Sequence, residues 1–221
     1  MDQKNIPQGI ESSPFIQKHS SILRIWHWTT FLILSASMIT VLINSTMLNP
    51  RDNIELVQNQ LKEKGVTVSE EQAFAVSHEY EDKMWDVHKL LGFGLAFLLV
   101  ARVLIELVQP REEKIRTRIK NTMALIKLND KNKVEYKHYL NVKRTYLLFY
   151  VLLFCMALTG LGLAFGRDLG FTREIHNAVK TVHSILQYCM YAFVLIHLGG
   201  VVIAENTKEK GIVSGMINGN N

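Results

Sequence analysis

Long runs without charged residues alternate with polar segments along this chain. No Asp, Glu, Lys or Arg occurs between Arg24 and Arg51, from Tyr146 to Gly166, or from Thr181 to Ala204. Each run is long enough for the ~20 helical residues that cross ~30 Å of hydrocarbon. A fourth segment, Trp85–Val108, carries charges only toward its two ends, where long side chains can snorkel to the membrane surface.

These runs predict an all-α integral membrane protein, a four-helix transmembrane bundle forming a single domain over residues 1–221. The spans are expected at about residues 22–48, 85–108, 146–166 and 180–204. A soluble all-α protein with buried helices is the alternative, and three charge-free runs of this length argue against it. The first twenty residues are polar and contain no signal-peptide core, so the first span is expected to remain as an anchor.

The distribution of basic residues predicts the orientation. Sixteen Lys and Arg residues fall on the side that holds both tails and the segment 109–145, and seven fall on the other side. The positive-inside rule therefore places both termini and the basic segment 109–145 in the cytoplasm. The net charge of +5 is then a consequence of topology. No basic patch with interleaved aromatic residues indicates nucleic-acid binding.

The segment between the first two spans, residues 49–84, is acidic. It holds eight carboxylates and four basic residues. Two helices are expected within it, one over Asn53–Lys64 and one after the capping-box pattern Ser69-x-x-Gln72. This outer segment is either a solvated surface or a docking face for a partner outside the membrane.

Two histidines of the fourth span, His183 and His197, are the most informative polar residues. Fourteen helical residues rise ~21 Å and bring both imidazoles to nearly the same face. Ionisable groups inside a bilayer are costly and indicate function. The predicted topology places His183 at the depth of His88 near the outer face, and His197 at the depth of His27 near the inner face. This arrangement predicts two bis-histidine sites for two stacked b-type haems.

Other sets of ligands are less consistent with the sequence. His176 competes with His183, but it would lie ~31 Å from His197, the whole membrane thickness. Zinc requires ligands that converge on one point, and a proton relay requires carboxylates, of which the spans offer only Glu106, paired with Arg102. The chain has no Cys-x-x-Cys-His pattern, which excludes covalent c-type haem. His19 and His78 are expected at the surface and His138 near the membrane interface.

Several stretches of the chain resemble a known family. Arg24-Ile-Trp-His-Trp28, His88 and the His-x13-His pattern resemble the bacterial cytochrome b561 superfamily. The stretch from Glu205 to Gly219 is similar to the b-type cytochrome subunit of membrane-bound nickel–iron hydrogenases. More distantly, the overall arrangement is similar to the cytochrome subunit of respiratory formate dehydrogenase. The similarity covers about residues 20–219 except the acidic outer segment. Thr159-Gly160 also fits, whereas Ile39-Thr-Val41 in the first span lacks the usual glycine.

The resemblance implies a function in the bacterial plasma membrane. The chain would be an electron-transfer subunit that links an extracytoplasmic hydrogenase-like or other redox subunit, through two haems b, to membrane quinone. Arg24, Glu205 and Asn206 are candidates for quinone binding, and Arg24, Lys89 and Lys180 for haem propionates. The alternative is a stand-alone quinone oxidoreductase of the b561 type that uses a small diffusible donor. A membrane scaffold or transporter without haem would leave the four histidines unexplained.

Overall fold

The computed structural model describes residues 20–111, 114–128, 133–207 and 211–219, in which the regular elements are α-helices. The polar N-terminal tail with His19 lies outside the described residues, as do five of the lysines counted for topology, Lys4, Lys18, Lys131, Lys208 and Lys210. The helices are α1 (Ser21–Thr46), α2 (Ile54–Glu63), α3 (Glu70–Val108), α4 (Ile115–Leu128), α5 (Lys133–Phe165), α6 (Arg173–Asn206) and α7 (Ile212–Asn218).

Four of these helices, α1, α3, α5 and α6, are long and apolar enough to cross a membrane. Their apolar side chains face outward to an unusual degree: Phe97 is 72% exposed, and Leu195 and Ile196 are each 71% exposed. A surface of this kind is stable in lipid and not in water. The predicted all-α membrane bundle with four spans is therefore confirmed, and the chain is a multi-pass membrane protein.

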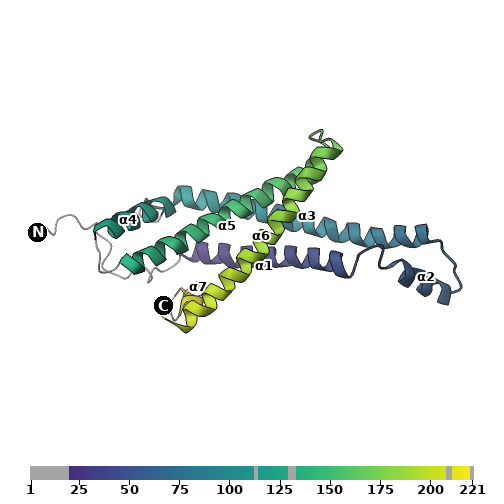
Figure 1. Cartoon of the computed structure of the whole chain (residues 1–221), viewed down its shortest axis with the longest axis horizontal. Coiled ribbons are helices and arrows are strands. Elements are labelled where there is room, and N and C mark those ends of the chain that lie inside the picture. Colours follow the sequence, from purple (N-terminus) through teal and green to yellow (C-terminus); the bar gives the residue numbers. More distant parts are fainter. Residues whose placement is uncertain (1–19, 112–113, 129–132, 208–210, 220–221) are drawn as a thin grey trace, which may run out of the picture.

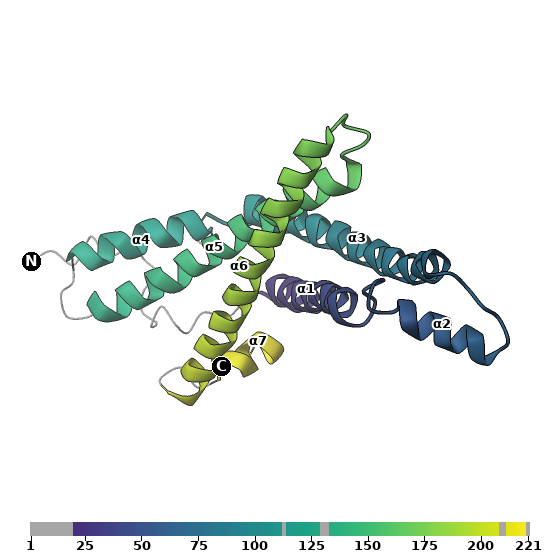
Figure 2. The ribbon, with the colours of Figure 1, turned by 45° about the vertical axis from the view of Figure 1, so that its right-hand side comes forward.

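The bundle is built from neighbouring pairs of helices. α1 packs along α3, α3 against α5, and α5 against α6. α6 runs obliquely across the others, and α7 folds back beside its carboxyl end (Figures 1 and 2). A small apolar core of Leu95, Leu153 and Met190 holds α3, α5 and α6 together, with Ile33 and Leu34 of α1 packed against it.

The buried face of α1 is mostly polar, which is the reverse of a helix in a soluble protein. The residues below one-tenth exposure follow helical spacing and are Trp26, Thr30, Ser37, Thr40 and Asn44. Small and polar residues commonly line helix interfaces in membranes, because lipid covers the apolar faces equally well. The Trp26 indole donates to the Leu98 carbonyl of α3 at 2.7 Å, which ties the first two spans together.

The outer segment is more regular than the sequence indicated. α2 and the Ser69–Gln72 capping box are confirmed. The helix that begins after Ser69 continues without a break into the second span, so α3 has 39 residues and a length of ~58 Å, well beyond the bilayer core. No Gly or Pro interrupts residues 70–91, and i,i+4 pairs such as Glu79–Lys83 support the helix where it is most charged.

The basic segment 109–145 also contains helices. α4 runs antiparallel to the first part of α5, which begins well before the predicted third span. Arg102 differs from the expected snorkelling residue, since it turns into the bundle and is only 6% exposed. Its guanidinium binds Glu106 and the Tyr150 hydroxyl, both at 3.0 Å, and Glu106 also accepts the Ile115 backbone N–H. Pairing inside the protein therefore replaces contact with the membrane surface.

Candidate functional site

Two histidine pairs occupy opposite ends of the bundle. The ring centres of His27 on α1 and His197 on α6 are 6.4 Å apart. The ring centres of His88 on α3 and His183 on α6 are 6.5 Å apart. These are the two pairs that matching by depth predicts, and we refer to them as the inner pair and the outer pair. That they bind haem iron stays a prediction.

The spacing within each pair fits one iron atom. An imidazole nitrogen binds a transition metal at ~2 Å and lies ~1 Å from its ring centre, so two axial imidazoles have centres ~6 Å apart. The backbone of α6 packs closely against α5 and α7. The backbones of α1 and α3, which carry the partner histidines of His197 and His183, lie farther from α6. A flat macrocycle between the rings requires such gaps.

A small hollow with largely apolar walls adjoins the outer pair. His88 and His183 line a hollow whose other walls are mainly apolar or weakly polar, and these include Leu34, Met38, Val41, Leu95, Leu153, Met156 and Met190. Gly160 of α5 lies against the His183 ring, where a Cβ atom would be 3.3 Å from Cε1. The absence of a side chain at Gly160 therefore permits the close approach of the His183 ring.

Each outer imidazole is held by a threonine hydroxyl. Nδ1 of His88 lies 2.9 Å from Thr40 Oγ1 and 3.3 Å from Ser37 Oγ. Nδ1 of His183 lies 2.8 Å from Thr159 Oγ1. Sequence reasoning missed both threonine contacts. Thr159 and Thr40 did stand in the two stretches compared with the family, but a sequence cannot show what a hydroxyl contacts.

The inner pair is surrounded by aromatic rings. Trp28 contacts His27 edge to face, with ring centres 5.4 Å apart. Phe193 lies parallel to His197 at 6.1 Å, with an angle of 7° between the planes. An aromatic ring also borders the outer pair, since Trp85 contacts His88 edge to face with ring centres 5.5 Å apart.

The remaining histidines lie elsewhere. His176 is in the first turn of α6, two turns before His183, and its side chain is half-buried. His78 pairs with Asp82 at 3.2 Å on the outer part of α3, and both side chains are exposed. His138 is exposed on α5. Among the described residues, no cluster of three or more His, Cys, Asp or Glu side chains has the arrangement of a metal site.

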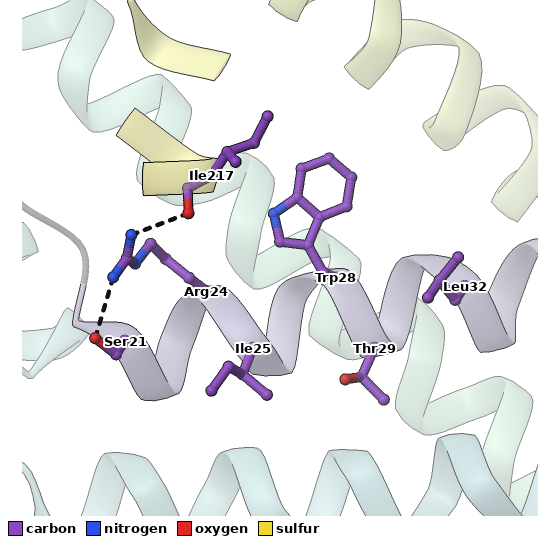
Figure 3. Close-up of a pocket in the computed structure, with 7 residues that line it drawn as sticks. All are labelled: Ser21, Arg24, Ile25, Trp28, Thr29, Leu32 and Ile217. Carbon is purple, nitrogen blue, oxygen red and sulfur yellow. Dashed lines mark hydrogen bonds between the residues drawn. The ribbon is translucent and has the colours of Figure 1, made fainter. Parts of the chain in front are cut away.

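Arg24 belongs to a pocket beside the inner pair (Figure 3). The pocket has a volume of about 350 Å³ and is lined by Ser21, Arg24, Ile25, Trp28, Thr29, Leu32 and Ile217. Arg24 donates to the Ile217 carbonyl and to the Ser21 hydroxyl, both at 3.1 Å. The Trp28 indole donates to the Met216 carbonyl at 3.1 Å. Helix α7 therefore forms one wall of this pocket.

Glu205 and Asn206 lie outside the lining of the pocket. The Glu205 carboxylate accepts the backbone N–H groups of Gly211 and Val213, both at 3.0 Å, and so fixes the start of α7. Asn206 donates to the Val202 carbonyl of its own helix at 2.7 Å. Direct contact of these two side chains with quinone stays a prediction, and the hydrogen bonds of Glu205 give it a structural role behind the pocket wall.

The candidate propionate partners at the outer face have different surroundings. Lys89 forms an ion pair with Asp86 at 2.8 Å, one turn away on α3. Lys180 is exposed on α6. Their contact with haem stays a prediction, as does that of Arg24.

Comparison with known proteins identifies the family. A family model described as prokaryotic cytochrome b561 matches residues 18–219, nearly the whole chain. Comparisons with curated proteins and with solved structures found no match. Together with four apolar spans and paired intramembrane histidines, this match establishes that the chain belongs to the prokaryotic cytochrome b561 family of membrane electron-transfer proteins that bind haem b.

Proposed function

We propose that this protein is a dihaem cytochrome that connects an extracytoplasmic redox subunit with membrane quinone. The observation that carries the proposal is the pair of ring separations, 6.4 Å and 6.5 Å, each of the size that one bis-histidine iron requires. When bound, haem supplies a one-electron iron couple whose potential the protein sets through its ligands and surroundings. His27 and His197 would hold one haem, and His88 and His183 the other.

The charge distribution supports the direction of this connection. With both tails and α4 in the cytoplasm, the outer pair faces the extracytoplasmic side and the inner pair lies near the cytoplasm. The rise of α6 between His183 and His197 is ~21 Å, so the two sites together extend across most of the hydrocarbon layer.

The Arg24 pocket is the proposed quinone site. Its volume of about 350 Å³ suits a small-molecule site, its walls are largely apolar, and it opens on the lipid-facing side of α1. Trp28 lines this pocket and also contacts the His27 ring, so a quinone here lies one aromatic ring away from the inner pair. Arg24 and the hydroxyl of Thr29 provide polar groups for a carbonyl oxygen.

The outer helices are the proposed docking face for the donor. α2 and the outer part of α3 pack on each other and present exposed carboxylates, among them Glu55, Glu70, Glu71, Glu79 and Asp82. An acidic face of this kind favours a protein partner with a basic surface. A hydrogenase-like subunit, as the resemblance implies, would dock here, whereas a small diffusible donor needs no such projection.

The haem assignment is tested by variants purified as full chains. His88→Ala is expected to remove one haem, and His27→Ala to remove the other, each leaving a b-type spectrum from the site that remains. His176→Ala is the matched control and retains both. Loss of the same haem from His27→Ala and His88→Ala would overturn the pairing.

The quinone site is tested by filling the pocket. Leu32 and Leu42 are both exposed leucines of α1, at 63% and 60%, and only Leu32 lines the pocket. Leu32→Trp should slow electron exchange with a quinone analogue, while Leu42→Trp should not, and both should keep their haem content. Equal rates in the two variants would place quinone elsewhere.

The donor is tested by comparing the isolated chain with its native complex. If a protein partner supplies electrons, a redox subunit should co-purify with the native cytochrome. Removal of residues 51–68 should then abolish its retention without loss of haem. Reduction of quinone by the isolated chain with a small donor, at the rate seen in membranes, would favour the stand-alone alternative.

A further inference from the structure

The hydroxyl groups of Thr40 and Thr159 occupy equivalent positions on two different helices. Each contacts Nδ1 of one histidine of the outer pair, at 2.9 Å for His88 and 2.8 Å for His183. Thr40 is 5% exposed and Thr159 is half-buried, so protein surrounds these contacts.

The proton of each hydroxyl is already donated to the backbone. Thr40 Oγ1 donates to the Ser37 carbonyl at 2.7 Å, and Thr159 Oγ1 donates to the Cys155 carbonyl, also at 2.7 Å. A threonine hydroxyl has one proton and two lone pairs. With the proton so engaged, a lone pair of the oxygen is available to accept from the imidazole, an arrangement that puts the hydrogen on Nδ1.

This hydrogen-bond direction determines which nitrogen is available to a metal. A neutral imidazole with hydrogen on Nδ1 has its free lone pair on Nε2. Metal-bound histidines typically donate their second N–H to a carboxylate, carbonyl or water, and this fixes the tautomer and the plane of the ring. In the outer pair, a threonine hydroxyl is the corresponding acceptor for each of the two histidines.

We propose that Thr40 and Thr159 are positioning residues of the outer site, which hold His88 and His183 as Nδ1–H tautomers with Nε2 directed to the iron. This inference rests on the proposed function, since it requires that the outer pair binds haem. Donation from Nδ1–H makes the ring a stronger electron donor and stabilises the oxidised iron. The two threonines therefore lower the reduction potential of the outer haem.

Thr159 is the cleaner position for the test. Ser37 lies within 3.3 Å of His88 Nδ1 and can replace the Thr40 hydroxyl, whereas the Thr159 hydroxyl is the contact recorded for His183 Nδ1 in the described part of the chain. Thr159→Val keeps the shape of the side chain and removes the acceptor, and Thr159→Ser keeps the acceptor. Thr122→Val is the control: Thr122, at 6% exposure, is more buried than Thr159 and likewise donates to a carbonyl of its own helix, that of Arg118, but it lies on α4, away from the histidines.

The experiment is a redox titration of the full-length cytochrome, combined with electron paramagnetic resonance of its oxidised low-spin haem. Thr159→Val should raise the potential of the outer haem, identified by its loss in His88→Ala, and alter its resonance signal. Thr159→Ser and Thr122→Val should match the wild type, and the inner haem should be unaffected in all three. Loss of the outer haem from the Val variant alone would also support the proposal.

The same behaviour of Thr159→Val and Thr159→Ser, whether both unchanged or both lacking haem, would overturn the inference, because the hydroxyl would then not be the acting group. Failure of the dihaem proposal is distinguishable, since it would already appear as fewer than two haems per chain in the wild type.

Discussion

Gly160→Ala is expected to weaken the outer haem site selectively. A Cβ on Gly160 would lie 3.3 Å from Cε1 of His183, closer than the ~3.5–4.0 Å of an unstrained carbon contact. The ring must therefore move by a few tenths of an ångström. It cannot do so freely, because its Nδ1 is bonded to the adjacent Thr159 at 2.8 Å.

The magnitude follows from what that movement disturbs. Weakening one hydrogen bond costs about 1 kcal/mol, and loss of an outer-shell partner typically weakens metal binding about 10–100-fold. The hydrogen bond is stretched and not deleted, so we expect the lower end, about tenfold weaker binding of the outer haem, or about 1.4 kcal/mol. The fold and the inner haem should be unaffected.

The assay is haem retention during dilution of the purified protein, followed by the reduced absorption spectrum. Gly92→Ala is the matched control, because a Cβ there meets no atom within 4 Å. Alanine generally favours the helical state over glycine, so the control should be at least as stable as the wild type. Equal haem retention by Gly160→Ala and Gly92→Ala would refute the reasoning.

Three further predictions concern single contacts. Glu106→Leu should destabilise the protein by about 3 kcal/mol, since it leaves the buried Arg102 without its carboxylate. Thermal unfolding should show that adding Arg102→Met to Glu106→Leu recovers part of this stability. No recovery would mean that the pair does not act as a unit. Glu205→Ala removes two hydrogen bonds that hold α7, so the C-terminal segment should exchange backbone hydrogens faster while haem content is kept, and unchanged exchange would show that α7 is held by other contacts. His183→Ala should lose one haem, and added imidazole should restore it. Retention of both haems by His183→Ala without added imidazole would exclude His183 as an axial ligand.

The sequence was sufficient for the membrane architecture because its signals are strong and local. Charge-free runs of span length admit few other folds, and the Ser69–Gln72 capping box marked the beginning of α3 correctly. The depth of each histidine followed from topology. The ring contacts bring together the expected partners, while their role as ligands stays a prediction.

Other features depend on tertiary contacts that no local pattern reveals. The pattern did not indicate that the helix after Ser69 continues unbroken into the Trp85–Val108 span, because an exposed charged helix and a polar loop have similar composition. Arg102 was expected at the membrane surface, and its burial depends on Tyr150 in another span. The fold-back of α7 onto Arg24 joins residues almost two hundred positions apart.

The polar residues of α1 also have a role that hydropathy cannot show. Polar residues at helical spacing on α1 could be attributed to interhelical packing alone. The structure places two of them, Ser37 and Thr40, at the imidazole of His88. The polar face of α1 thus serves both the packing of the spans and the orientation of a candidate ligand.

The ratio of haem to protein tests the central claim most directly. The full-length chain, purified in detergent and measured by its reduced b-type absorption against the protein concentration, should contain two haems b per chain. A ratio of one or none in fully loaded wild-type protein would contradict the assignment of both histidine pairs.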